Sequence, residues 1–433
     1  MLQSEFGKIE RRDAIYFIAI AIGSGVLFSF NMFHPFLRIL LIAFLLFQAV
    51  KDPFRCWGTF IVTQRYIDRL FSSYVSVAIL GILFLSFFIK KPHMLRKLKD
   101  GLILLIGVPL IAISIIVGQR SNTTTGIYMG IILLTILAML NFSDSVSRTD
   151  TTKIAFAYCC GAVSVAIYFM ISMATHVSIL KYGRLNFFGD IKPIAFATFI
   201  PLLFIVSSKL EGKKCFDNVN SKLLDAVLIV IYAAIIILTV ARGMIFAGIV
   251  ALGIQALLSK NQVKAVWRLL PVVLFVAVFI YMTMASSNLR IARIFTFQDT
   301  ELGSLNGRTL AWGEYFELYR GGNILRKIFG FGPGDGGRLI SSGLYTHSTF
   351  LDYLISYGAV GFISMLAYEL KAMKRVFNSK DLILFVVLIF SIVAEATHGN
   401  SANFALLSLQ TFLILCVAAN NSSDKAVVEE KSK

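Results

Sequence analysis

Apolar runs of about 15–20 residues recur along most of the chain, and they constrain the fold more than any other feature. Runs of this length match helices that cross the hydrocarbon core of a bilayer, whereas barrel strands would show about ten residues of alternating polarity. Because the bilayer core holds no water, each run must satisfy its own backbone hydrogen bonds as a helix. The sequence therefore predicts an all-α integral membrane protein.

The charge balance agrees with a membrane location. Charged residues make up 15% of the 433 residues, and the mean hydropathy is +0.78; soluble domains carry about 25% charged residues. The net charge of +17 is 41 basic minus 24 acidic residues. Most of the basic residues fall in short loops between apolar runs, so they indicate topology rather than nucleic-acid binding. The five cysteines show no metal-ligand spacing, and we interpret them as apolar filler.

We expect 12 to 14 transmembrane helices. The predicted spans are 13–31, 36–50, 71–89, 101–118, 127–141, 154–174, 190–208, 223–241, 243–258, 269–287, 349–370, 381–397 and 402–419. Residues 53–66 either form an extra short span, or one of the other spans lies at the membrane interface. The chain divides into N-terminal helices (1–100), a central bundle (101–287), a long loop (288–347), C-terminal helices (348–420) and a disordered tail (421–433).

Basic residues set the orientation of these spans. Lysine and arginine concentrate in the loops 90–100, 142–153, 209–222, 259–268 and 371–380, which we assign to the cytoplasm together with both chain ends. The opposite side then holds the long loop 288–347, Arg184, Arg242 and His398. The long loop is itself basic, but loops near 60 residues cross the membrane largely regardless of charge.

Three arginines on this outer side are candidate ligands for an anion. Arg242 interrupts an apolar stretch and needs a partner, a cavity or an interfacial position for its charge. Arg184 lies in a short loop, where it either binds a ligand or is simply solvated. Arg308 follows an Asn306-Gly307 turn. Lys192 and Arg338 are further cationic candidates.

The long loop contains two patterned segments. Residues 310–319 are amphipathic, because Ala311, Tyr315, Leu318 and Tyr319 share one helical face, and the following Gly321-Gly322 is a plausible C-terminal stop. This helix lies either at the membrane surface or on the helices beneath it. The glycine-dense turn 330–337 lacks the spacing of a nucleotide-binding loop. Its backbone either forms an anion-binding nest or acts as a hinge.

His347 is the best candidate for a general base. Ser348 or Thr349 can cap the helix that follows, and Thr349 with Asp352 is typical of a capping box. The positive end of that helix disfavours an imidazolium ion, so a neutral ring would be ready to accept a proton. The alternative is a structural interfacial histidine. His398 is a second polar candidate and ranks below His347.

Arginines around one base favour transfer from a phosphorylated leaving group. Guanidinium groups can stabilise a departing diphosphate, and the sequence shows no clustered carboxylates for a metal, so we expect no metal and no cofactor. Attack by a hydroxyl that His347 deprotonates would invert the anomeric centre of the sugar.

The same residues resemble a known family. His347-Ser348, nine residues and then Gly358-x-x-Gly361 resembles the H-[NSQ]-x9-G-x-x-G signature of bacterial O-antigen ligases and Wzy-type O-antigen polymerases. Gly307-Arg308-x-x-x-Trp312 and the Gly330-x-Gly332-x-Gly334 turn are similar to the same family. The resemblance covers roughly residues 180–400.

The resemblance implies a GT-C-like membrane glycosyltransferase with one long periplasmic loop in the bacterial inner membrane. It implies an undecaprenyl-diphosphate-linked glycan as donor, a glycolipid acceptor, and a flippase and chain-length regulator as partners. Arg184, Arg242, Arg308, Arg338 and His398 would bind diphosphate or sugar, and His347 would activate the acceptor. We favour a polymerase of lipid-linked repeat units. An O-antigen ligase acting on lipid A-core is the alternative, and a lipid-linked glycan transporter is a second one.

Overall fold

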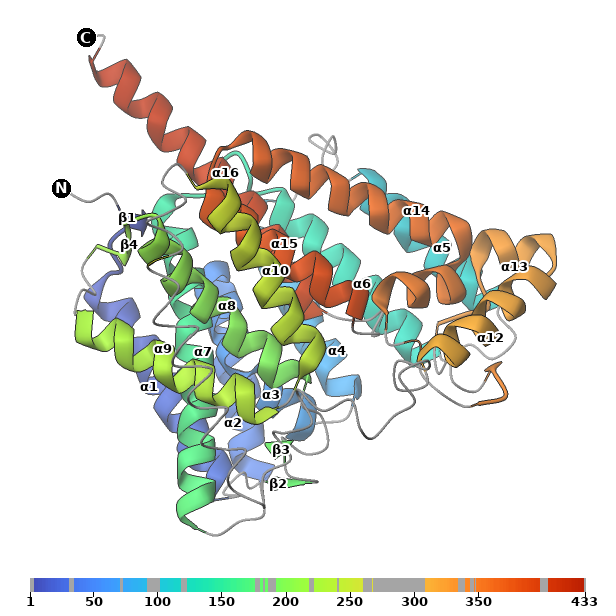
Figure 1. Ribbon diagram of the computed structural model, residues 1–433, viewed down its shortest axis with the longest axis horizontal. Helices are drawn as coiled ribbons and strands as arrows, with labels where there is room; N and C mark the ends of the chain where they lie inside the picture. Colours follow the sequence, from blue (N-terminus) through green and yellow to red (C-terminus); the bar gives the residue numbers. More distant parts are fainter. Residues whose placement is uncertain are drawn as a thin grey trace.

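Helices account for nearly all regular structure in the part of the chain that is described (Figure 1). The structure is a computed structural model and describes residues 4–30, 35–70, 73–91, 102–117, 123–175, 180–181, 184–185, 192–217, 222–239, 241–259, 267, 308–333, 339–342, 346, 348–397 and 404–431. Arg11–Ser29, Arg148–Ala174 and Thr349–Asn378 are long and apolar enough to cross a membrane, and eight shorter apolar helices accompany them among these residues. The predicted all-α membrane class agrees with this architecture.

The helices follow the predicted spans closely. They are α1 (Arg11–Ser29), α2 (Pro35–Lys51), α3 (Pro53–Leu70), α4 (Ser73–Lys90), α5 (Leu102–Val117), α6 (Thr123–Leu140), α7 (Arg148–Ala174), α8 (Lys192–Leu210), α9 (Lys222–Thr239), α10 (Arg242–Leu258), α12 (Arg308–Gly321), α13 (Ile324–Phe329), α14 (Thr349–Asn378), α15 (Leu382–Thr397) and α16 (Phe404–Lys431). The predicted span 269–287 lies outside the described residues.

Helix α3 answers the question left open for residues 53–66. The segment forms a full helix, and Trp57 is completely buried in the core against Phe54 and Phe87. Asp52 begins the helix by accepting the N–H groups of Phe54 and Arg55, each over 3.1 Å, and proline fills the first helical position. The segment is therefore an extra helix of the bundle.

The end of the chain corrects one prediction. Residues 421–433 were expected to form a disordered tail, but α16 continues through Lys431 and projects beyond the bundle (Figure 1). The sequence interpretation failed because the segment is mostly polar and charged, but a helix can continue there on its backbone hydrogen bonds.

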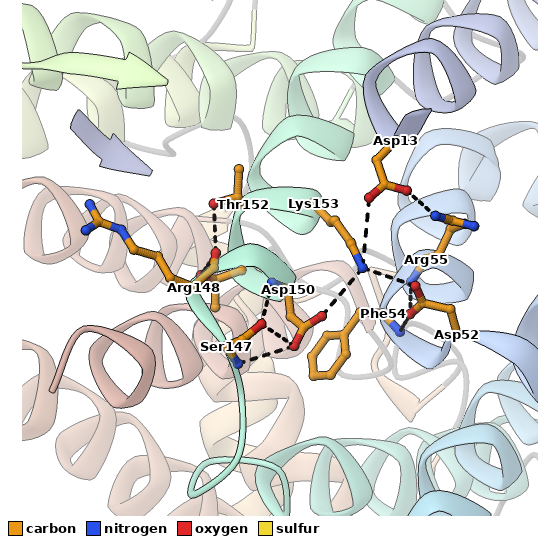
Figure 2. A network of polar contacts seen from close by, with 10 residues as sticks. Asp13, Asp52, Phe54, Arg55, Ser147, Arg148, Asp150, Thr152 and Lys153 are labelled. Carbon is orange, nitrogen blue, oxygen red and sulfur yellow. Dashed lines mark hydrogen bonds and ion pairs between the residues drawn. The ribbon is translucent and has the colours of Figure 1, made fainter. Parts of the chain in front are cut away.

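Helices α1, α3 and α7 run parallel and begin at the same end of the bundle. Their first turns meet in a charged network, where Arg55 pairs with Asp13 and Lys153 reaches Asp52 over 3.1 Å (Figure 2). Further along the same helices, Tyr66 and Ser24 both bond to the hydroxyl of Ser164, at 2.7 and 2.8 Å. The network therefore sets the register of the three helices.

We call this end of the bundle the proximal end: residues 4–13, 52–55, 91, 141–153, 209–217 and 222–225. Strand β1 (Ser4–Phe6) pairs in parallel with β4 (Lys214–Phe216) there. The side chain of Asn141 donates to the carbonyl of Lys91 over 3.1 Å, which joins the end of α4 to the loop before α7. Lys209 pairs with Asp225, so α9 also begins at the proximal end.

We call the opposite end the distal end: residues 114–117, 123–126, 174–175, 180–181, 184–185, 239, 241–242, 308–333, 339–342, 346 and 348–358. Helices α7 and α9 start at the proximal end, so α7 ends and α10 begins at the distal one. The short strands β2 (Leu180–Lys181) and β3 (Arg184–Leu185) pair antiparallel and lie across the molecule from β1 and β4 (Figure 1). A Cβ on Gly126 at the start of α6 would lie 3.0 Å from Pro333, so the glycine turn also belongs to this end.

Candidate functional site

Helix α12 anchors the described part of the long loop at the distal end. Its buried face carries Ala311 and Tyr315, both fully buried against Phe331, Leu351 and Ile355. The predicted amphipathic face is confirmed, and α12 ends at Gly321, the first glycine of the predicted stop. The helix packs on α13 and α14, which supports the prediction that this segment lies on the helices beneath it.

The glycine turn interlocks with a break in α14. Gly358 adopts φ 69° and ψ −168°, which interrupts the helix and leaves carbonyl groups of the preceding turn without helical donors. The N–H of Phe331 donates to the carbonyl of Ile355 over 2.8 Å, and the N–H of Gly332 donates to that of Ser356 over 3.2 Å. The hydroxyl of Ser114 on α5 also donates to Ser356 O, over 2.6 Å.

Glycine is required on both sides of this contact. A Cβ on Gly330 would lie 2.3 Å from Ser356 O, and a Cβ on Gly358 would lie 2.3 Å from Ile328 O. Both residues also have positive φ, which side chains other than glycine rarely adopt. The turn was expected to be an anion nest or a hinge. In its described part, two N–H groups are instead used to hold the broken helix.

The residues on both sides of position 347 are held by hydrogen bonds. The indole N–H of Trp312 donates to the carbonyl of Thr346 over 2.6 Å, and the Thr346 hydroxyl donates to Asp352 Oδ1. Ser348 is the N-cap of α14, because its Oγ accepts the N–H of Leu351. Of the two predicted caps, Ser348 and Thr349, the structure shows Ser348. Asp352 reaches back to Thr346, so the expected Thr349–Asp352 box is not the arrangement at this helix start.

Glu314 ties the outer side of α12 to the segment before residue 343. Its carboxylate accepts from the hydroxyl of Ser341 and from the hydroxyl and N–H of Ser342, at 2.5 and 3.2 Å for Ser342. The hydrogen bonds from Ser341 and then Ser342 lower the pKa of Glu314 below its usual value. The carboxylate therefore stays ionised and keeps both serines in place.

The predicted site residues fall at the margin of what is described. Arg184 lies in β3, Arg242 is the first residue of α10 and Arg308 is the first residue of α12, and their side chains are outside the described part. All three backbone positions belong to the distal end. Lys192 begins α8. Arg338, His347 and His398 lie outside the described residues, so their roles stay predictions.

A water-sized cavity lies alongside the break in α14, with lining residues on both sides of Gly358. It holds about 30 Å³ and is lined mainly by apolar side chains of α5, α6, α14 and α16, with Tyr353, Tyr357 and Ser364 on the α14 side. A space of this size fits one water molecule, not a sugar. Among the described residues, no three histidine, cysteine, aspartate or glutamate side chains gather as a metal site.

A buried polar cluster escaped the sequence interpretation. Glu369 on α14, Glu395 on α15 and Gln410 on α16 meet inside the bundle. The signal was present in the sequence, because an acidic residue inside an apolar span is costly and marks a functional position by default. Glu395 lies inside the predicted span 381–397, and Glu369 lies at the end of the span 349–370.

Comparisons with protein-family models and with curated proteins find no match for this chain.

Proposed function

We propose that the protein is a membrane glycosyltransferase that polymerises undecaprenyl-diphosphate-linked repeat units of a surface polysaccharide. One observation carries the proposal: the two parts of the histidine–glycine signature have separate structural uses in α14. Ser348 caps the helix next to His347, and Gly358 supplies the break that receives the glycine turn. A motif whose glycines meet a demanding backbone requirement is less readily explained by chance.

The membrane arrangement follows from the two ends of the bundle. The proximal end carries the basic loops 142–153 and 209–222, so we assign it to the cytoplasm, and the distal end to the periplasm. With α3 as a crossing, four helices precede the basic loop 90–100. An even number of crossings places the N-terminus on the same, cytoplasmic side as that loop. The proposal thus comprises a multi-pass inner-membrane protein of 12 to 14 spans with a GT-C-like architecture and a periplasmic loop 288–347.

In the proposed reaction, His347 takes the proton of an acceptor sugar hydroxyl. The hydroxyl oxygen attacks the anomeric carbon of the donor, the bond from that carbon to the diphosphate oxygen breaks, and the configuration inverts. Arg184, Arg242 and Arg308, aided by Arg338 and His398, would stabilise the charge on the departing diphosphate. The hydrogen bonds on Thr346 and Ser348 support this role for His347, because they hold the chain on both sides of it.

Transport of a lipid-linked glycan is the second candidate function. The sequence predicts 349–370 as one continuous span, whereas the structure breaks this helix at Gly358. Discontinuous helices with polar residues inside the bundle are typical of secondary transporters. The break and the buried carboxyl pair of α14 and α15 are the observations that favour this candidate.

The test is complementation of a strain that lacks the protein with wild type, H347A or H93A. H347A should abolish glycan transfer while its membrane level matches wild type. H93A is the matched control, since His93 lies in a predicted cytoplasmic loop. Wild-type activity in H347A contradicts the base role and favours the transporter.

The glycan that accumulates in the deletion strain separates the acceptors. If single repeat units accumulate on lipid A-core, the missing protein is a polymerase. Long chains left on the carrier lipid indicate a ligase instead. Purified protein that elongates a lipid-diphosphate-linked repeat without any flippase excludes transport as its sole activity.

A further inference from the structure

Two carboxyl groups and one amide meet where α14, α15 and α16 pack together. The exposed fraction is 2% for Glu369 and 0% for both Glu395 and Gln410. The amide nitrogen of Gln410 donates to Oε1 of Glu369 and, over 2.8 Å, to Oε1 of Glu395. One side chain therefore holds both carboxyl groups close together in the interior.

The negative charge of this pair has no basic partner in the described part of the chain, where the ion pairs involve other acidic residues. The tyrosines that interact electrostatically with the pair, Tyr353 and Tyr368, both come from α14 and bring no positive charge. Helices α6, α7, α8 and α10, which also pack on α15 or α16, supply no described basic group to it. Two adjacent carboxylates buried without a cation cannot both stay ionised.

Unpartnered oxygen atoms give a second, independent indication. Glu369 Oε2, Glu395 Oε2 and the amide Oε1 of Gln410 have no hydrogen-bond partner among the described residues. The amide oxygen lies within the cluster, because the nitrogen of the same planar group contacts both carboxyl groups. The two carboxyl groups are also within hydrogen-bonding reach of each other. With both ionised, however, the cluster has acceptors in excess and too few donors.

We propose that Glu369, Glu395 and Gln410 form a proton-binding site in which the two carboxyl groups share one exchangeable proton. The proton makes one carboxyl group a donor to the other and removes one of the two negative charges. A metal cation fits less well, since the amide hydrogens of Gln410 face both carboxyl groups. Intramembrane acidic residues are typical of proton paths, so this site adds proton binding to the proposed glycan transfer and does not depend on it.

Infrared spectroscopy of the purified full-length protein tests the site. A protonated carboxyl group has a C=O stretch distinct from the bands of a carboxylate. Protein whose glutamate side chains carry ¹³C in the carboxyl group should show a shifted C=O band at neutral pH, which assigns the proton to glutamate without any mutation. The band should disappear in E369Q/E395Q, whose side chains keep their shape, and persist in E317Q, which alters an exposed carboxylate of α12.

Each outcome decides the proposal. Labelled wild-type protein without a protonated glutamate band at neutral pH overturns it, whether or not the double variant folds. A band that survives in folded E369Q/E395Q also overturns it. A rise in Tm with sodium chloride but not with choline chloride, present in wild type and lost in E369Q/E395Q, assigns a metal cation instead.

Discussion

Single side chains decide how firmly the residues on both sides of position 347 are held. The indole N–H of Trp312 donates a hydrogen bond over 2.6 Å to the carbonyl of Thr346, the residue just before position 347. A phenylalanine at this position keeps an aromatic ring on α12 but donates no hydrogen bond. Sequence reasoning noted Trp312 as part of a motif, but the carbonyl that it contacts lies in another segment of the loop, so the contact itself was not predictable.

We expect W312F to lower glycan transfer about tenfold, because a lost hydrogen bond of about 1.4 kcal/mol in the transition state corresponds to that factor. The measurement is chain elongation by purified protein at saturating donor. W57F is the control: the indole of Trp57 has no hydrogen-bond partner among the described residues, so the change loses ring volume alone. Equal losses in both variants would contradict a positioning role for Trp312.

Asp52 combines a helix cap with an ion pair at the proximal end. Burial alone would raise the pKa of Asp52, but the N–H of Arg55 and the ammonium group of Lys153 outweigh it and lower that pKa. A lowered pKa means that ionised Asp52 stabilises the fold above its unfolded-state pKa of about 3.9. This stabilisation is lost as the pH falls through the lower, folded-state pKa.

We therefore expect D52N to unfold at a lower temperature than wild type at neutral pH, and the difference to disappear in strong acid. D52A should lose about 1 kcal/mol more than D52N, because asparagine still caps α3 and alanine does not. Thermal unfolding in detergent across this pH range gives both quantities. A difference between wild type and D52N that grows on acidification would show that the ion pair is not its source.

At the scale of elements, α14 is broken where Gly358 packs closely against Gly330 of the glycine turn. Replacing Gly358 with alanine places a Cβ against the backbone of residue 328 and forces a positive φ on a residue with a side chain. We expect G358A to lower both Tm and transfer activity strongly, with a cost of about 1–3 kcal/mol from the backbone conformation alone. G313A is the control, since a Cβ there meets nothing within 4 Å. A G358A variant with unchanged Tm and transfer activity would mean that α14 is continuous.

The sequence predicted most helices within a few residues, because a bilayer-length apolar run admits one backbone solution. It also predicted the buried face of α12 from Ala311 and Tyr315. The sequence predicted α14 as a continuous span, because a glycine inside an apolar run does not by itself indicate a break in the helix. The partner of that break lies more than twenty residues away, and contacts of this range leave no mark on periodicity.

At the scale of the whole molecule, the proximal and distal ends make a prediction about sidedness. With the five native cysteines replaced, D144C reports the proximal end and G321C the distal end, both at exposed positions. An impermeant maleimide should label G321C in cells whose outer membrane is permeable, and D144C after the inner membrane is opened. Labelling in the reverse order would invert the proposed orientation.

The sequence could place the candidate arginines on one side, because helix alternation and basic loops carry that information. Their backbones at the starts of α10 and α12 and in β3 agree with this grouping at the distal end. Distances among Arg242, Arg308 and His347 stay predictions, since these side chains are outside the described part. The buried cluster of Glu369, Glu395 and Gln410 shows the converse: its members come from three helices, and no local pattern joins them.

The pairing of β1 with β4 has a consequence for biosynthesis. Strand β1 (Ser4–Phe6) pairs with β4 (Lys214–Phe216), which is translated only after the eight helices α1–α8 that lie between the two strands. Strand β1 must therefore stay unpaired while these eight helices are synthesised, and it docks only then. A bulky fusion partner placed directly before β1 would obstruct this late docking, whereas one placed after α16 would not.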